Sequence, residues 1–200
     1  MLNTVNDLNG WTVAAVGGSN YTAQMLKHPN IGNAQFVLAK DVPNNVSALE
    51  GVLNGKYDAA ILVTTQPAKV FDTPGIKENL PKLKMLPVPA DLSDRISKFY
   101  PGKASLTYQA MGDGGMNVST FQVMSVMLAA NYSKGPYAEA IDHFRTCVVE
   151  NASEIASRPR TSPAWRFIAN ATKNGIPPTG NWELWTLPGK PAAPAPKKKN

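Results

Sequence analysis

The sequence predicts an α/β fold built on a layered, mainly parallel sheet, and three observations lead to this prediction. Short runs rich in Ala, Val and Ile, with little polar alternation, occupy residues 11–16, 35–39 and 58–63. Runs of this kind are typical of strands that are covered on both faces. Helical patterns separate the runs, and strands that alternate with helices indicate parallel pairing. Apolar residues make up 43% of the 200-residue chain, which allows a buried core and excludes wholesale disorder.

The first half of the chain alternates predicted strands with predicted helices. After the first strand, two glycines precede a helical pattern over residues 19–28. A second helix is expected over 45–55. Residues 83–87 predict another strand, which is ended by the prolines beside it. A short helix is expected at about 90–99, with an apolar face that consists of Leu92, Ile96 and Phe99.

The second half contains two extended segments and the clearest helix. Residues 105–110 and 117–129 are expected to be extended, with a glycine-rich loop at 111–116 between them. Apolar spacings of three and four predict a helix over 135–157. Its apolar stripe consists of Tyr137, Ile141, Phe144, Val148, Ala152 and Ile155. The aromatic-rich residues 161–185 are expected to form short helices and loops that wrap across the body.

The net charge of +6 does not indicate a nucleic-acid-binding protein, because the charge is unevenly placed. Residues 187–200 contain no acid, and without them the body carries only +2, which is too little for a phosphate-binding face. This Pro- and Ala-rich tail is expected to be extended and solvated. Its final lysines either contact an acidic partner or lipid surface or belong to a disordered end: Lys197, Lys198 and Lys199.

Several classes of protein find no support in the composition. The single cysteine excludes an internal disulfide framework and a cysteine-based zinc cluster. No stretch approaches the ~20 apolar residues of a membrane span. Residues 1–10 show no basic and apolar regions of a secretory signal, so we expect a cytoplasmic protein or a processed or truncated sequence. No paired carboxylates, Ser-His-Asp order or metal-ligand spacing stands out, and we expect no catalytic residue, metal or cofactor.

The strongest candidate for ligand binding is the loop that follows the first predicted strand and begins a helix. Glycines let the backbone turn sharply and approach a ligand. The free N–H groups and the positive dipole end of a helix start favour a carboxylate or phosphate. The loop lacks the Walker and dinucleotide-binding patterns. Its residues either bind an anion or form an ordinary capped turn: Gly17, Gly18, Ser19, Asn20, Tyr21 and Thr22.

Three further features have competing interpretations. His143 and Cys147 are four residues apart, but a dyad or metal site needs further groups, so we interpret Cys147 as a half-buried packing residue. The loop at 111–116 is either a mobile rim or a plain strand connection. The tryptophans within 161–185 either stack bases or sugars or pin the chain to its core, and we favour the second.

Six segments, in this order, carry a resemblance to a known family. They are DLNGWTVA (7–14), GGS (17–19), ALEGVLNGKYDAA (48–60), LKMLPV (83–88), FRTC (144–147) and SPAW (162–165). Together they resemble the TAXI-type solute-binding receptors of tripartite TRAP transporters. The resemblance extends from about residue 7 to 186, and it implies a structural role for Cys147 and Trp165.

The resemblance implies a fold like that of periplasmic binding proteins, with one complete lobe and part of a second. Residues 1–86 would form the second lobe, 87–186 the return half of the first lobe, and 187–200 a tail. The glycine-rich loop with which the family begins has no counterpart before residue 7. We therefore expect the chain to represent the C-terminal two-thirds of such a receptor.

The function implied by the resemblance is the binding of a small carboxylate in the periplasm and its delivery to membrane transporter subunits, without catalysis. The Gly17–Thr22 loop would hold the carboxylate, and Tyr108 with the loop at 111–116 would form the opposite wall. An alternative is a non-catalytic interaction subunit of a larger periplasmic or membrane-associated complex. Such a subunit would derive from a receptor and would have lost ligand binding.

Overall fold

The computed structural model describes residues 2–97, 102–111, 115, 117–123, 130, 132, 134–159, 161–162 and 164–174. The chain divides into two compact units. The first consists of Met1–Thr64 and Ala68–Met124, and the second of Thr65–Pro67 and Ser125–Asn200. This division differs from the predicted boundary at residue 86, because the chain up to Met124 joins the first unit.

The first unit contains the predicted parallel sheet. Three short strands, β1 (Thr12–Ala15), β2 (Val37–Leu38) and β3 (Ala59–Ile61), pair in the order β2-β1-β3. Both pairings are parallel, and Val13 of β1 lies opposite Leu38 on one side and Ala59 on the other. The structure therefore confirms the predicted α/β class, with β1 as the central strand.

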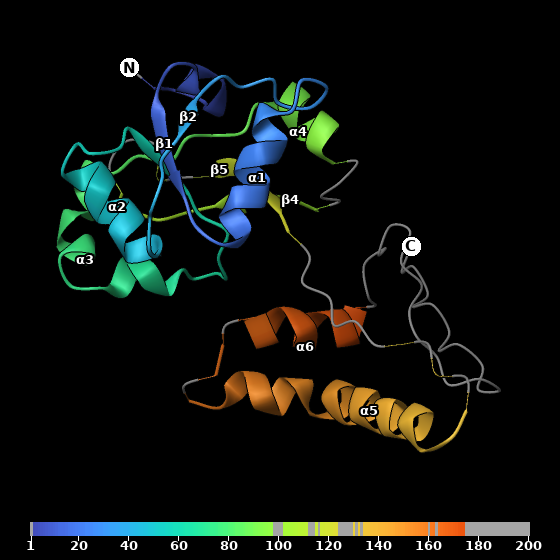
Figure 1. The fold of residues 1–200 in the computed structure, drawn as a ribbon. Helices are drawn as coiled ribbons and strands as arrows, with labels where there is room; N and C mark the ends of the chain where they lie inside the picture. Colours follow the sequence, from blue (N-terminus) through green and yellow to red (C-terminus); the bar gives the residue numbers. More distant parts are fainter. Residues whose placement is uncertain are drawn as a thin grey trace, which may run out of the picture. The chain divides into compact units, whose positions relative to one another are not determined.

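Two helices cover opposite sides of this sheet (Figure 1). They are α1 (Gly18–Lys27), which follows β1, and α2 (Asn45–Leu53), which follows β2. The side chains of β1 alternate between them, as the period of a strand requires. Val13 and Ala15 belong to the core that contains Ala23 and Leu26 of α1, whereas Ala14 packs with Ala48 of α2 and with Tyr57. Three of the four side chains of β1, those of Val13, Ala14 and Ala15, are buried, which explains its apolar run.

Short helices and an antiparallel pair of strands complete the first unit. The helical turns are η1 (Val5–Leu8), η2 (Lys69–Asp72), α3 (Ile76–Asn79), η3 (Leu80–Lys82) and α4 (Ala90–Ile96). Leu92 and Ile96 of α4 are buried in the core beside α1, as predicted for its apolar face, while Phe99 lies outside the described residues. The strands β4 (Gly102–Leu106) and β5 (Val118–Gln122) pair antiparallel to each other.

The predicted strand at 83–87 is wrong. These residues form no strand, and their segment runs past the antiparallel pair instead. A ladder needs N–H donors at regular intervals, and Pro87 and Pro89 have none. Just after this stretch, the Val88 N–H donates a backbone bond to the Ser119 carbonyl of β5, at 2.9 Å.

The second unit contains two helices that pack side by side (Figure 1). They are α5 (Pro136–Ser157), which confirms the helix predicted over 135–157, and α6 (Ala164–Asn174). The predicted apolar stripe is partly wrong, because Tyr137 is 68% exposed and Phe144 51% exposed. The buried residues of α5 are Ala138, Asp142 and Ala152. Two of these three are alanines, and small side chains allow close approach between helices.

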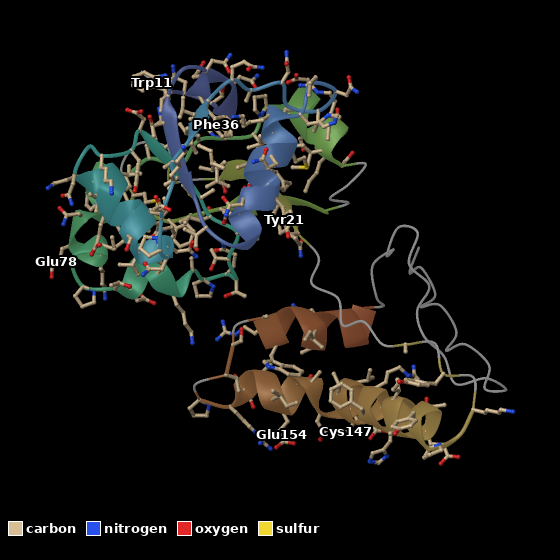
Figure 2. All side chains as sticks on the ribbon, viewed as in Figure 1. Trp11, Tyr21, Phe36, Glu78, Cys147 and Glu154 are labelled. Carbon is tan, nitrogen blue, oxygen red and sulfur yellow. The ribbon has the colours of Figure 1, made fainter. Side chains whose placement is uncertain are left out.

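Two other predictions concern the second unit. Cys147, expected to be half-buried, is exposed on α5 (Figure 2). It lies outside the helix face that carries the buried residues Ala138, Asp142 and Ala152. Trp165 is half-buried on α6. Trp182, Trp185 and the tail at 187–200 lie outside the described residues. Within the described part of the chain, every helix is too short or too polar to cross a bilayer.

The close approach of Gly32 to α1 provides a test of the first unit. A Cβ at Gly32 would lie 2.0 Å from the Leu26 carbonyl oxygen, which belongs to the backbone and cannot rotate away. We expect Gly32→Ala to reduce the free energy of unfolding by about 1–3 kcal/mol, measured by urea denaturation. Gly18→Ala is the control, because a Cβ there meets no atom within 4 Å. Equal stability of the two variants would contradict this packing.

Candidate functional site

The loop predicted to bind an anion lies where β1 ends and α1 begins. Gly17 has φ 53° and ψ −124°, a conformation that favours glycine, and it precedes the first residue of α1, Gly18. Both glycines are exposed. Their backbone N–H groups donate to no acceptor in the described part of the chain, whereas the Ser19 and Asn20 N–H groups donate to the Val16 and Gly17 carbonyls. The loop therefore presents two adjacent N–H donors at a helix start.

Ser19 has a different environment from the glycines beside it. Its side chain is 1% exposed, and its Oγ accepts a hydrogen bond from the Val63 N–H at 2.8 Å. Val63 follows β3, so this bond joins the start of α1 to the end of the neighbouring strand. Sequence reasoning left Ser19 either in an anion site or in a capped turn and missed this role, because the partner is 44 residues away. In the structure, the Ser19 side chain links the loop to the end of β3.

The remaining residues of the loop divide into exposed and buried positions. Asn20 is exposed, and Tyr21 is 78% exposed. Thr22, three residues after Ser19 and on the same helix face, is only 2% exposed. Its Oγ1 is buried and has no hydrogen-bond partner among the described residues. A buried hydroxyl without a partner is costly, so Thr22 is an unusual choice in the first turns of α1.

The strand order puts this loop at a characteristic position in α/β proteins. Helix α1 connects β1 to β2, which lies at one edge of β1. Helix α2 then connects β2 to β3, which lies at the other edge of β1. In open α/β sheets, ligands bind outside the carboxyl ends of the strands, at the point where the strand order reverses. The Gly17–Thr22 loop and Val63 both lie at this end.

Tyr108, the residue predicted for the opposite wall, is held by groups elsewhere in the first unit. Its hydroxyl accepts a hydrogen bond from the Ala68 N–H at 2.9 Å. Its ring packs edge-on against Phe71, with 4.8 Å between the centroids. These contacts place Tyr108 beside η2 and do not join it to the Gly17–Thr22 loop. Of the predicted wall at 111–116, Met111 and Gly115 are described, Met111 is buried, and residues 112–114 and 116 lie outside the described residues.

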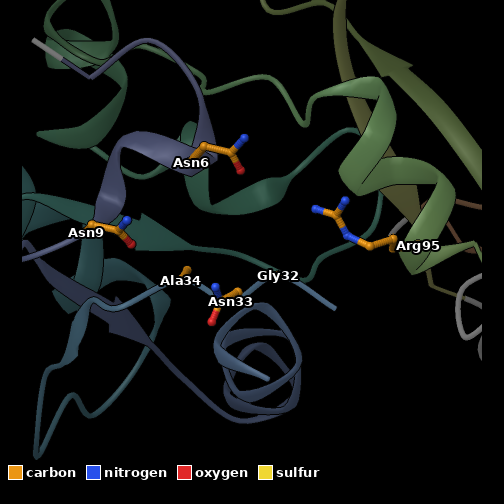
Figure 3. Close-up of a pocket in the computed structure, with 6 residues that line it drawn as sticks. All are labelled: Asn6, Asn9, Gly32, Asn33, Ala34 and Arg95. Carbon is orange, nitrogen blue, oxygen red and sulfur yellow. The ribbon is translucent and has the colours of Figure 1, made fainter. Parts of the chain in front are cut away.

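An open hollow of about 230 Å³ lies at a second place in the first unit (Figure 3). It is lined by Asn6, Asn9, Gly32, Asn33, Ala34 and Arg95. Asn9 precedes β1, and Gly32 to Ala34 follow α1, so the hollow lies at the amino edge of the sheet. Sequence reasoning missed it, because its polar residues come from three separate segments and form no motif.

Several hydrogen bonds fix the walls of the hollow. The Asn9 Oδ1 accepts the Gln35 N–H at 2.7 Å. The Arg95 Nε donates to the Ile31 carbonyl at 2.6 Å, and its Nη1 donates to the Asp91 carboxylate at 3.1 Å. Asn33 adopts φ 52°, in the left-handed region that Asn tolerates better than most residues. The loop after α1 is therefore tied to both η1 and α4.

A capping box holds η1, which carries Asn6 and ends before Asn9. The Asp7 Oδ2 accepts the N–H groups of Asn3 and Thr4, both at 2.8 Å, and the Thr4 Oγ1 accepts the Asn6 N–H. These bonds, the one from Asn3 first, lower the pKa of Asp7 below its ordinary value, because they favour the charged carboxylate.

His143 and Cys147 are the two residues of α5 that the sequence analysis considered for a dyad or metal site. Both are exposed on α5, and the Cys147 Sγ accepts a hydrogen bond from the Asn151 Nδ2 at 3.6 Å. Across the residues that the structure describes, no group of three or more His, Cys, Asp and Glu side chains is placed to hold a metal ion.

No family model matches the chain, and no match was found among curated proteins or solved structures. The resemblance to TAXI-type receptors therefore stays a prediction. The geometry of the loop and of the hollow is the basis for assigning a function.

The buried Ser19–Val63 bond predicts a stability effect. Ser19→Ala leaves the Val63 N–H without an acceptor, and we expect the free energy of unfolding to fall by about 1–3 kcal/mol in urea denaturation. Asn20→Ala, at the exposed neighbour, is the control and should change stability by less than about 0.5 kcal/mol. A Ser19→Ala protein as stable as the control would show that the hydroxyl does not brace the loop.

The capping box predicts a pH effect at η1. Because the Asp7 pKa is lower in the folded chain than in the unfolded chain, its stabilising contribution is complete above the unfolded pKa. That contribution is lost as the pH falls through the folded pKa. Carboxyl carbon NMR should give Asp7 a lower pKa in the native protein than in the urea-unfolded chain. Identical values in the two states would contradict the capping box.

Proposed function

We propose that this chain is a solute-binding protein for a small carboxylate, held at the Gly17–Thr22 loop, with no catalytic step. The observation that carries the proposal is the pair of exposed, unengaged N–H groups of Gly17 and Gly18 at the start of α1. This pair lies at the carboxyl end of the central strand, where the strand order reverses.

The physical reason for a carboxylate is the field at the helix start. The first N–H groups of a helix have no partner within it, and the aligned peptide dipoles give this end a partial positive charge. A carboxylate has two oxygens that can each accept one N–H bond. Exposed Asn20 adds an amide donor beside the two glycines. The absence of a side chain at Gly17 and Gly18 leaves room for a ligand, since a Cβ at either meets nothing within 4 Å.

The buried residues of the loop, Ser19 and Thr22, favour a fixed position of the Gly17 and Gly18 N–H groups. Ser19 ties the helix start to Val63, and Thr22 lies below it on the same face. A rigid donor pair loses little conformational entropy when a ligand binds, which favours affinity. The Thr22 hydroxyl is an additional polar group in the same region, without a partner among the described residues.

Transport is the proposed context. Two segments that resemble TAXI-type receptors, residues 7–14 and 48–60, meet in the sheet. The Thr12 N–H donates to the Asp58 carboxylate at 2.8 Å, and the Asp58 N–H donates to the Thr12 carbonyl at 2.9 Å. This pairing makes the two segments parts of one structure, which supports the resemblance. The proposed role is to bind the carboxylate outside the cytoplasm, in the periplasm, and to deliver it to TRAP-type membrane subunits.

A pair of variants at Gly18 tests the binding site. Proline is tolerated at the first position of a helix, so Gly18→Pro removes one N–H donor while keeping the helix, and Gly18→Ala keeps the donor. We expect wild type and Gly18→Ala to bind glutamate or a small 2-oxo acid in calorimetry. Gly18→Pro should bind about tenfold or more weakly, because a hydrogen bond to a charged group is lost. Equal affinity of the proline and alanine variants would remove this loop from the site.

A second candidate function is supported by the surface of α5. Tyr137 and Phe144 lie seven residues apart on one helix face, and both are more than half exposed. Exposed aromatic residues on one face are a common feature of protein interfaces. This favours the alternative of a non-catalytic subunit that docks on a larger periplasmic or membrane-associated complex, with the basic tail that includes Lys197–Lys199 as an additional contact.

Native purification distinguishes the two functions. A free monomer that binds a carboxylate supports the receptor. A stable hetero-complex that binds no carboxylate supports the subunit, and the double variant Tyr137→Ser, Phe144→Ser should then release the chain from its complex. Val123→Ser, at another exposed apolar residue but in the first unit, is the control. A complex unaffected by the double variant would exclude α5 as its interface.

A further inference from the structure

The hollow at the amino edge of the sheet is distinct from the loop of the proposed function. It is lined by Asn6 and Asn9 beside η1, by Gly32, Asn33 and Ala34 after α1, and by Arg95 of α4. The Gly17–Thr22 loop lies at the opposite end of α1. Figure 3 shows the guanidinium of Arg95 extending from α4 toward the side that carries the three asparagines. One cation and three amides therefore line one small space.

The hydrogen bonds already made leave donors available in the hollow. Arginine has five N–H donors, and Arg95 uses its Nε for the Ile31 carbonyl and one Nη1 proton for Asp91. No bond of its Nη2 is found among the described residues, and 43% of the side chain is exposed. The Asn9 amide is oriented by the bond from Gln35 to its Oδ1, so its NH₂ group remains as a donor. The hollow therefore contains available donors on the Arg95 guanidinium and on the Asn9 amide. A hydrogen bond to the backbone holds each of these two side chains in place.

The charges around the hollow determine which ligand it suits. None of the residues that line it is acidic. Asp91, the partner of Arg95, is 63% exposed, and the hydrogen bond between them engages only the Nη1 of the guanidinium. The Asp7 carboxylate on η1 is occupied by the N–H groups of Asn3 and Thr4. The lining thus carries the Arg95 guanidinium, which Asp91 pairs at one nitrogen, and neutral amides that can donate to, or accept from, hydroxyl and carbonyl groups.

We propose that this hollow is a second binding site, for a small hydroxycarboxylate, independent of the Gly17–Thr22 loop. The ligand carboxylate lies against the Nη2 and the remaining Nη1 proton of Arg95, since two such donors match the two oxygens of a carboxylate. The amides of Asn6, Asn9 and Asn33 bind the adjacent hydroxyl group. The volume of about 230 Å³ is large enough for a small hydroxycarboxylate.

An isosteric variant tests the donor arrangement. Asn9→Asp keeps an oxygen that can accept the Gln35 N–H, but it replaces the NH₂ donor with a negatively charged oxygen. We use glycolate as the probe, with chloride at equal ionic strength as the reference, and follow the side-chain amides of Asn6 and Asn33 by NMR. In wild type we expect saturable shifts, and in Asn9→Asp at least about tenfold weaker binding. Unchanged binding in Asn9→Asp, or wild-type shifts that do not saturate, would overturn the proposal.

Further variants separate the fold from the ligand and one site from the other. Arg95→Met should weaken glycolate binding at least tenfold, while Lys103→Met, which removes one cation from the same unit outside the hollow, should not. Asn33→Gly keeps the left-handed backbone and should weaken binding without unfolding the loop. Backbone amide spectra report folding in each variant. Binding that survives both Arg95→Met and Asn33→Gly would contradict the proposal.

The same substitution at the loop, Asn20→Asp, distinguishes this site from the proposed function. We expect it to leave glycolate binding in the hollow unchanged. If glycolate shifts the Gly17 and Gly18 amides but not those of Asn6 and Asn33, the hollow is excluded and the loop is supported. If it shifts the amides of Asn6 and Asn33, the hollow is supported, whether or not the Gly17 and Gly18 amides also shift.

Discussion

The central strand β1 is the element on which the rest of the first unit depends. It is hydrogen-bonded in parallel on both edges, to β2 and to β3, and its three apolar side chains are buried on the two faces. Hydrogen bonds to residues just before and just after β3 close the two ends of this arrangement. The Asp58 carboxylate accepts the Thr12 N–H at the start of β1, and the Ser19 Oγ accepts the Val63 N–H beyond its end. Because these bonds link segments far apart in sequence, they place α1 firmly against the sheet.

The position of α1 explains why both candidate sites occur where they do. Its N-terminus presents the Gly17 and Gly18 N–H groups at the carboxyl edge of the sheet. Its C-terminus leads into the tight turn at Gly32, where the chain passes so close to Leu26 that no side chain fits. The same turn places Asn33 and Ala34 beside Asn9 and Arg95. A shift of α1 along β1 would therefore disturb both sites, although they lie at opposite ends of the helix.

Much of the first unit could be predicted from sequence because local and global signals agree there. The apolar runs of β1, β2 and β3 and the helical patterns between them identify the α/β class, and each element appears within a few residues of its expected bounds. The strand at 83–87 was mispredicted, because an apolar pattern does not reveal whether a partner can supply its hydrogen bonds. Pro87 and Pro89 weaken such a ladder, and the pairing partner of β5 is β4 instead. In α5, the spacing of Tyr137 and Phe144 predicted a buried stripe, but the buried positions are smaller residues and Asp142.

The sites were harder to predict, because they depend on contacts between distant residues. The loop could be found from its glycines and its place after a strand, but the burial of Ser19 and Thr22 depends on the position of β3. The hollow has no signal in the sequence, since three asparagines and one arginine from separate segments become neighbours only in the folded chain. The role of Tyr108 was assigned by resemblance alone, whereas the fold engages it with Ala68 and Phe71.

The central claim is that the exposed amides at the start of α1 bind a carboxylate. The most direct test is to follow the backbone amide protons of Gly17 and Gly18 by NMR while glutamate or a small 2-oxo acid is added to the full chain. Both protons should move downfield and saturate together, because each would donate a hydrogen bond to an oxyanion. Amides that stay in place while the acid binds elsewhere would contradict the claim.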